Sequence, residues 1–228
     1  MKIGENATGF IKATAGSPRV HPGEPMKNAA EICSVIDQAE ALKADVLVLP
    51  ELVLSGYTAA DLFLRAPLLE GVLTALECIK DHLKRPESEG LIVVLGAPIR
   101  ADGRLFNCAV FLQNGRVLGI VPKSHLPNYQ EFYEARWFSP ASEAVSSTAE
   151  LLGDTVPFGT DLIFESASGL AIAAEICEDL WVAQPPAAAT AAAGANVIVN
   201  LSASNETAGK AKFRRELVRL QSARSICA

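Results

Sequence analysis

Residues 44–52 read ADVLVLPEL and join a short apolar run to a proline and a glutamate. Val46–Leu49 is a continuous β-branched and leucine run, which is typical of a strand buried on both faces of a sheet. Pro50 ends that strand, because proline cannot donate to a sheet hydrogen bond. Apolar residues at helical spacing predict an amphipathic helix over Met26–Lys43, directly before the strand. Helix followed by buried strand predicts an α/β fold, with Glu51 at a strand end.

The rest of the chain continues this mixture of strands and helices. Further helices are predicted for Pro67–Leu83, for the alanine-rich segment after Pro185 and Pro186, and from about Lys210 to the last residue. Strands are predicted for residues 10–13, 91–99, 105–113, 116–123, 161–164, 170–176 and 196–204. Residues 124–160 are predicted to be one long loop, rich in aromatic side chains. Because some strands alternate with helices and others form hairpins, a mixed sheet layered with helices is expected.

Composition places the chain among compact globular proteins. It has 228 residues, of which 50% are hydrophobic and 20% charged, so residues 1–228 are expected to form one large domain. The formal net charge of −6 gives no basic surface for nucleic acid. No stretch reaches the roughly 18 apolar residues that a membrane span needs, so no membrane association is expected.

The cysteines and histidines give no sign of a disulfide framework or a metal site. The five cysteines are odd in number, widely spaced and without a C-x-x-C pair, which predicts a reducing, cytoplasmic location. The three histidines do not form a metal-binding motif, and no glycine-rich nucleotide loop is present. We therefore expect no metal and no cofactor in this chain.

Three polar residues with the chemistry of amide hydrolysis each follow an apolar run: Glu51, Lys123 and Cys177. Reacting groups gather at the carboxyl ends of strands in sheets of this kind. A cysteine with its ordinary pKa of about 8.5 is mostly thiol at neutral pH, so a nucleophilic Cys177 needs a base such as Glu51. The Lys123 ammonium suits the oxyanion that forms when sulfur attacks a carbonyl. Glu51 can then return the proton to the leaving amine.

Each of the three also has a structural explanation when taken alone. Cys177 can be a small buried hydrophobe, Glu51 a loop carboxylate or cap, and Lys123 a solvated charge at the sheet edge. The catalytic hypothesis depends on their combination, which the sequence does not place in contact.

Three strings carry a resemblance to a known family. They are LVLPELVLSGY at residues 47–57, VPKSHLPNYQEFYE at residues 121–134 and EICEDLW at residues 175–181. They resemble the catalytic motifs of the nitrilase, or carbon-nitrogen hydrolase, superfamily, in the order Glu, Lys, Cys that the family uses. The second and third strings, with VNLSAS at residues 199–204, are more similar to glutaminase domains of glutamine-dependent NAD synthetases than to plain nitrilases or amidases. The resemblance runs from about Gly9 to the last residue.

The resemblance implies a nitrilase-like α-β-β-α sandwich with Glu51 as general base, Lys123 as oxyanion-stabilising cation and Cys177 as nucleophile. A γ-glutamyl thioester would form on the cysteine and ammonia would leave. By the same likeness, the glutamine-binding residues fall at Tyr57, Tyr129, Glu178, Ser204 and Lys210. Glu178 suits the substrate ammonium. Lys210 stands where some relatives have an arginine, and a lysine pairs with a carboxylate only as a point charge.

The binding residues have structural alternatives that the sequence leaves open. Tyr129 can pack the long loop, Ser204 can cap the last helix, and Glu178 with Asp179 can place negative charge at a helix N-terminus. Trp137 and Trp181 are expected in the core or the pocket wall rather than in specific ligand contacts.

The resemblance also implies what lies outside this chain. Synthetases of this type join the glutaminase to a second domain that uses ATP and Mg²⁺ to convert deamido-NAD to NAD, and we expect that domain to lie outside these 228 residues. Because the last helix has no stop signal, we expect the glutaminase fold to be truncated and C-terminally incomplete, and the 228-residue chain to be weakly active, unstable or inactive by itself. Turnover at full-length rates would refute this. A homo-oligomer is also implied.

Three hypotheses follow. The first is the synthetase glutaminase; the second is a stand-alone amidase or carbamoylase of the same superfamily, acting on another small C–N substrate; the third is a non-catalytic assembly fragment. A downstream pyrophosphatase loop of the S-G-G-x-D-S type in the parent gene would select the first. Composition and spacing do not separate glutamine from other amides.

Overall fold

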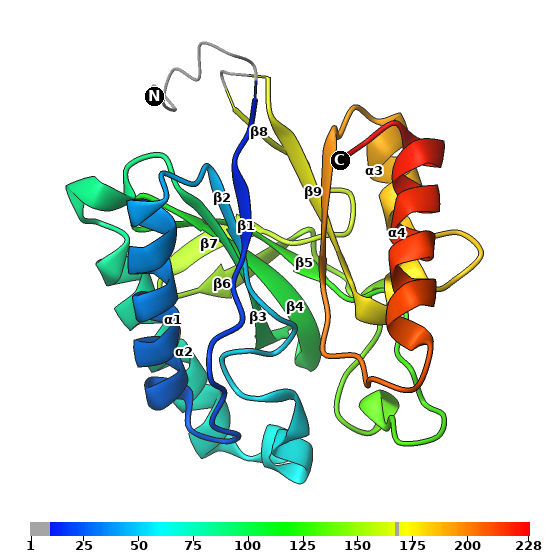
Figure 1. Ribbon diagram of the computed structural model, residues 1–228. Helices are drawn as coiled ribbons and strands as arrows, with labels where there is room; N and C mark the ends of the chain where they lie inside the picture. The colour runs from blue at the N-terminus through cyan, green and yellow to red at the C-terminus, as the bar shows by residue number, and fades with distance from the viewer. Residues whose placement is uncertain (1–9, 167–168) are drawn as a thin grey trace.

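The computed structural model describes residues 10–166 and 169–228, so Gly9 and the rest of residues 1–9 of the predicted domain lie outside the described part. The chain folds as an α-β-β-α sandwich, in which two helices cover one sheet and two others cover a second sheet (Figure 1). The α/β prediction and the sandwich implied by the resemblance are both confirmed.

The first sheet has five strands in the order β1-β2-β3-β4-β5. Strands β1 to β3 run parallel, whereas β4 and β5 follow as an antiparallel meander. Helices α1 and α2 cover its outer face. The bounds are β1 Ala13–Ala15, α1 Pro25–Ala41, β2 Val46–Val48, α2 Ala66–His82, β3 Ile92–Ala101, β4 Arg104–Gln113 and β5 Arg116–Pro122.

The second sheet has three strands in the order β10-β9-β8, with β10 parallel and β8 antiparallel to β9. A separate hairpin, β6-β7, packs beside β5. Helices α3 and α4 cover the outer face of this sheet (Figure 1). The bounds are β6 Thr148–Leu151, β7 Asp154–Pro157, β8 Phe164–Glu165, β9 Ala171–Ile176, α3 Pro186–Ala192, β10 Val197–Leu201 and α4 Lys210–Ser225. Short 3₁₀ turns occupy Tyr57–Leu64, Pro86–Ser88, Glu134–Arg136, Ala141–Glu143 and Cys177–Leu180.

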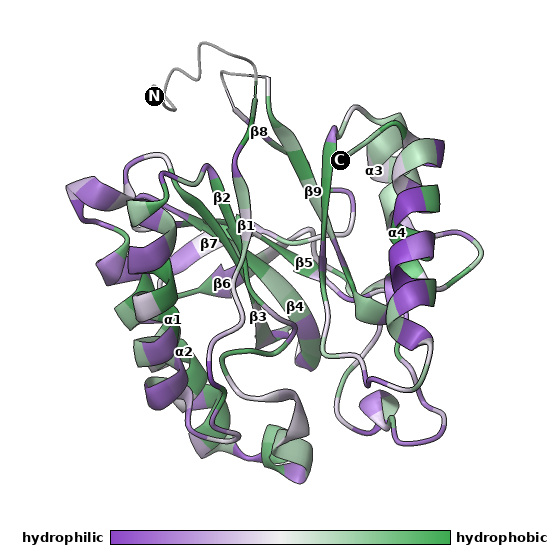
Figure 2. Cartoon of the chain, viewed as in Figure 1, coloured by the Kyte–Doolittle hydropathy of each residue, from purple (hydrophilic) through white to green (hydrophobic). Residues whose placement is uncertain are grey.

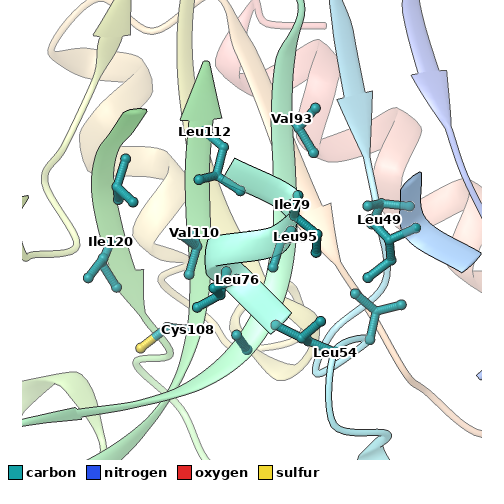
Figure 3. Packing of buried hydrophobic residues seen from close by; sticks show 14 of the residues in the cluster. Leu49, Leu54, Leu76, Ile79, Val93, Leu95, Cys108, Val110, Leu112 and Ile120 are labelled. Atoms are coloured by element: carbon teal, nitrogen blue, oxygen red, sulfur yellow. The ribbon is translucent and has the colours of Figure 1, made fainter. Parts of the chain in front are cut away.

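Two apolar layers hold the sandwich together. One layer lies between helices α1 and α2 and the first sheet, where Leu76 and Ile79 of α2 meet Leu95 and Val110 (Figure 3). The other layer lies between the two sheets and includes Phe111, which stacks on Phe164 with ring centroids 3.9 Å apart. The strands are mostly hydrophobic, whereas the outer faces of the helices are largely hydrophilic (Figure 2). Because of this pattern, the spacing of hydrophobic residues in the sequence identified most of the helices and strands.

Four predicted features of the fold are wrong. Two predicted strands are displaced. The first strand begins at Ala13 rather than Phe10, because its pairing with β2 starts at Ala13. The strand predicted at residues 161–164 lies at Phe164–Glu165, because these are the residues that pair with β9.

The predicted loop 124–160 contains the β6-β7 hairpin, whose turn has left-handed residues at Leu152 and Gly153. The alternation of polar and apolar residues along Thr148–Leu151 was the available signal in the sequence.

The fourth correction concerns the last helix, which ends at Ser225 and does not run to the last residue. Ile226 is left-handed, with φ of 53°, and closes the helix without the glycine that usually marks such an end. The Ser222 hydroxyl donates to the Cys227 carbonyl over 2.6 Å. Ala228 then pairs with the start of β10 through two backbone hydrogen bonds of 2.9 Å.

Candidate active site

The turn after β2 places Glu51 in the interior. Gly96 of β3 lies against this turn so closely that a Cβ there would be 2.2 Å from the Leu52 nitrogen and 2.6 Å from the Pro50 oxygen. Only glycine permits this approach, and the Gly96 amide donates to the Pro50 carbonyl over 3.2 Å. Leu52 itself is left-handed, with φ of 49°. The side chain of Glu51 is thereby fully buried.

Lys123 enters the same interior from the end of β5. Its backbone amide donates to the Asn107 carbonyl over 2.8 Å, which continues the pairing of β5 with β4. Its Nζ donates to Glu51 Oε1 over 2.7 Å and to Glu134 Oε1 over 2.6 Å, with the lysine side chain fully buried. Two of the three predicted catalytic residues are therefore in direct contact.

Glu134 and Asn107 belong to this site and were not predicted. The Asn107 Nδ2 donates to Glu51 Oε1 over 2.7 Å and to Glu134 Oε2 over 3.4 Å. Glu134 is the last residue of the string that begins at Val121, and it is 1% exposed. A carboxylate in a motif string is an available signal, but nothing in its spacing indicated burial beside Lys123. We call Glu51, Asn107, Lys123 and Glu134 the buried cluster.

Cys177 follows β9 at the first residue of a 3₁₀ turn, in a left-handed conformation with φ of 47°. The conformation is uncommon for a residue with a side chain and marks a strained turn. Asp179 stabilises this turn, since its carboxylate accepts from the amides of Ile176, Ser124 and His125 over 3.0, 3.3 and 2.8 Å. The turn after β9 is thus tied to the loop that follows Lys123.

The sulfur of Cys177 lies within the electrostatic reach of the buried cluster. Burial raises the pKa of the Cys177 thiol to about 12, the Glu51 carboxylate adds to the increase, and Lys123 opposes it. Cys177 is therefore a neutral thiol at physiological pH and must lose its proton as it reacts. The residue is 7% exposed, so the thiol is close to the interior.

Charge balance in the buried cluster favours a charged lysine. Burial alone would lower the pKa of Lys123, but the carboxylates of Glu51 and Glu134 outweigh it and raise the pKa. Burial raises the pKa of Glu134; Lys123 opposes this and Glu51 adds to it. Burial and the Glu134 charge likewise raise the pKa of Tyr57, whose hydroxyl donates to Glu134 Oε1 over 2.7 Å.

Four of the five predicted binding residues lie nearer the surface than the buried cluster. The Tyr129 hydroxyl donates to both Glu178 carboxylate oxygens, at 3.0 and 3.1 Å, and Tyr129 is 51% exposed. Lys210 lies 5.5 Å above the Trp181 ring, and its Nζ donates to Asn205 Oδ1. We call Tyr129, Glu178, Ser204 and Lys210 the rim.

The structure separates the predicted binding residues into two groups. Tyr57 is partly buried and bonds to Glu134, whereas Tyr129 and Glu178 contact each other at the surface. Ser204 does not cap the last helix, because the residue before α4 is Gly209 and no side chain caps it. The Ser204 amide instead donates to Ser202 Oγ over 3.3 Å. Ser202 and Ala203 are further residues of the site that were not predicted.

Trp137 packs against a buried apolar cluster, whereas Trp181 contacts residues nearer the surface. Trp137 donates through Nε1 to Asp61 Oδ1 over 2.9 Å and also contacts the ring of Phe63. Trp181 stacks on Phe213 with centroids 5.7 Å apart. Within residues 10–166 and 169–228, no three His, Cys, Asp or Glu side chains gather as metal ligands. In the same ranges, no helix combines the length and apolarity needed to cross a bilayer.

The sandwich, with a glutamate, a lysine and a cysteine gathered at its strand ends, is characteristic of enzymes that act on carbon–nitrogen bonds. The carbon-nitrogen hydrolase family matches residues 13–228, and the chain belongs to this family.

The proteins similar to this chain include glutamine-dependent NAD(+) synthetases and an amidase. The chain is 43% identical over 225 residues to a glutamine-dependent NAD(+) synthetase of Mycobacterium tuberculosis, a match that covers 96% of this chain and 32% of the relative. The crystal structure of a glutamine-dependent NAD(+) synthetase from Cytophaga hutchinsonii superposes with a TM-score of 0.81 at 30% identity, covering 95% of this chain and 34% of that one. An amidase from Nesterenkonia sp. shares the fold, with a TM-score of 0.73 at 17% identity over 95% of this chain and 73% of the amidase. The chain thus spans about a third of the length of the synthetases that it matches.

Proposed function

We propose that this chain hydrolyses the side-chain amide of glutamine and supplies the ammonia to a synthetase that converts deamido-NAD to NAD. The observation that carries the proposal is the buried cluster beside Cys177, in a chain 43% identical to named glutamine-dependent NAD(+) synthetases. In this proposal Glu51 is the general base, Lys123 the cation that stabilises the oxyanion, and Cys177 the nucleophile.

The first half of the reaction forms a thioester. Glu51 takes the Cys177 proton as Sγ bonds to the amide carbon, and the carbonyl electron pair moves to oxygen. That oxyanion is stabilised by the Lys123 ammonium, which Glu51 and Glu134 keep charged. The carbonyl re-forms, the C–N bond breaks, and Glu51 gives its proton to the nitrogen, which leaves as ammonia.

The second half restores the enzyme. Water gives a proton to Glu51 and bonds to the thioester carbon, and the oxyanion again forms beside Lys123. The C–S bond then breaks, the sulfur takes the proton back, and glutamate leaves. One glutamine and one water yield one glutamate and one ammonia, and Cys177 ends as a thiol.

The rim suits the two charged ends of glutamine. The Glu178 carboxylate can accept from the substrate ammonium, and Tyr129 already holds that carboxylate through its hydroxyl. Lys210 offers a single positive charge to the substrate carboxylate. The Ser204 amide donates to Ser202 Oγ, and that oxygen lies 3.4 Å from Cys177 Sγ. The whole-protein partners we propose are a second domain of the same polypeptide, which uses ATP and Mg²⁺, and further copies of the same protein.

The test is labelling with 6-diazo-5-oxo-norleucine, a glutamine-like electrophile, followed by peptide mass spectrometry. We expect one adduct, at Cys177, which free glutamine suppresses and asparagine does not. Butyramide is a second competitor, because a stand-alone amidase for simple amides would be protected by it instead. Equal labelling of Cys33, Cys78 and Cys227, with no protection by glutamine, would contradict the proposal.

A further inference from the structure

The chain that leaves β10 passes directly over the reacting groups. The Ala203 amide donates to Glu51 Oε2 over 2.9 Å. The Ser202 hydroxyl lies 3.4 Å from Cys177 Sγ, within the range of a hydrogen bond to sulfur. Two consecutive residues therefore contact the proposed base and the proposed nucleophile, one through its backbone and the other through its side chain.

The hydroxyl of Ser202 has a defined direction. The Ser204 amide donates to Ser202 Oγ over 3.3 Å, so one lone pair of this oxygen is already occupied. The hydroxyl hydrogen is then free to point at the sulfur of Cys177. The sulfur accepts from Ser202, which leaves its own hydrogen free to point toward Glu51.

We propose that Ser202 is a positioning residue, whose hydroxyl orients the Cys177 sulfur while the adjacent Ala203 amide holds Glu51. One short segment after β10 would thus set the geometry between nucleophile and base. The inference concerns the same site as the proposed function, and its kinetic readout rests on that function.

The contact gains strength as the reaction proceeds. Hydrogen bonds to an ionised acceptor are shorter and stronger than those to a neutral one. When Glu51 removes the thiol proton, the sulfur becomes negative and the Ser202 donor faces a charge. The hydroxyl is among the groups that lower the pKa of Cys177, against the larger effect of burial. Loss of the hydroxyl is expected to make the thiolate harder to form.

The experiment measures how fast iodoacetamide alkylates Cys177, using peptide mass spectrometry over a pH range of about 7 to 10. Ser202→Ala removes the donor and keeps the Cβ. We expect alkylation about tenfold slower at a fixed pH, which corresponds to an upward shift of about one pH unit. Ser222→Ala is the matched control, since it removes a hydroxyl that bonds to the Cys227 carbonyl, away from the site. It should leave the alkylation rate unchanged.

The steady-state constants kcat and KM distinguish a positioning role for Ser202 from the substrate-binding role proposed for the rim. Ser202→Ala should lower kcat and leave KM for glutamine near its wild-type value, because the lost contact is to the nucleophile. An unchanged pH profile of alkylation in Ser202→Ala would overturn the inference, as would a higher KM with unchanged kcat. Alkylation needs no glutamine. A shifted profile in a protein that does not hydrolyse glutamine would support the role of Ser202 and reject the proposed function.

Discussion

The buried cluster and the rim hold their polar groups in different ways. In the buried cluster, the side chains of Glu51, Lys123 and Glu134 are 0, 0 and 1% exposed, and each has at least two hydrogen-bond partners. At the rim, Tyr129 is half-exposed, and among the described residues its hydroxyl bonds to the Glu178 carboxylate. The groups proposed to react are thus fixed by protein contacts, whereas the groups proposed to bind substrate have contacts that water can replace.

This difference follows from the energetics of burial. An unpaired buried charge costs several kcal/mol, so the interior groups must satisfy one another. Surface contacts of the same kind contribute little to folding because water screens them. Changes in the buried cluster should therefore alter both stability and turnover, and changes at the rim should alter substrate affinity alone.

The largest effect is expected for Glu51→Gln. The glutamine side chain keeps the size of glutamate but cannot accept the Cys177 proton, so kcat should fall by about 10³-fold or more. The measurement is ammonia release at saturating glutamine, with Glu150→Gln on the exposed hairpin as the control. A loss of less than about tenfold would mean that Glu51 is not the base.

The second-largest effect is expected on the free energy of unfolding, when Lys123 is replaced. Lys123→Met leaves two buried carboxyl groups without their cation, and should lower the free energy of unfolding by about 3 to 5 kcal/mol at neutral pH. Adding Glu134→Gln removes one of those charges and should recover part of the loss. Urea unfolding measures both.

Lys84→Met is the control for that comparison. Its Nζ lies 2.5 Å from Asp81 Oδ1 on the exposed face of α2, a pair open to solvent. Its unfolding midpoint should match that of the wild type. A Lys123→Met protein as stable as Lys84→Met would contradict the contrast between interior and surface.

Glu175 extends the comparison to a buried carboxyl group that has no cation among its described partners. It is 2% exposed, and burial raises its pKa to about 7, with Asn200 opposing the change. Since the folded pKa lies above the unfolded value, its contribution to stability is complete below about pH 4.5 and is lost as pH rises through 7. Glu175→Gln stays neutral, so its stability relative to wild type should increase from pH 5 to pH 8, by up to about 3 kcal/mol. A pH-independent difference in the unfolding midpoints would contradict the assigned pKa.

The smallest effects are expected at the rim. Glu178→Gln removes the charge that would face the substrate ammonium, and Tyr129→Phe removes the hydroxyl that holds it. Each should raise KM for glutamine by about tenfold or less, with kcat nearly unchanged and the same unfolding midpoint as wild type. A fall in kcat at constant KM would place these residues in the chemistry rather than in binding.

The sequence predicted the architecture because the strands are nearly all apolar and the helices have one apolar face. Val46–Leu49 was identified as a buried strand on that basis, and the run that ends at Ile176 was identified as a strand. Boundaries that depend on a partner were not predictable. The first strand is bounded by its pairing with β2, and α4 ends on the left-handed Ile226, which has no local signal.

The sequence predicted three candidate catalytic residues but not the residues that contact them. Strand ends gave Glu51, Lys123 and Cys177, and the structure places Lys123 against Glu51. Asn107 lies inside a β-strand, where a polar residue gives no periodic signal of its partner. Ser202 and Ala203 reach the site only because β10 lies beside β9, a contact set by the sheet. Such contacts depend on tertiary packing rather than on local sequence.

The most direct test of the account is to trap the covalent intermediate. The protein is mixed with glutamine, quenched in acid within the first turnover, digested and analysed by mass spectrometry. We expect a γ-glutamyl group on the peptide that contains Cys177, and its accumulation should vanish in Cys177→Ala along with ammonia release. Ammonia release that persists in Cys177→Ala would contradict the account.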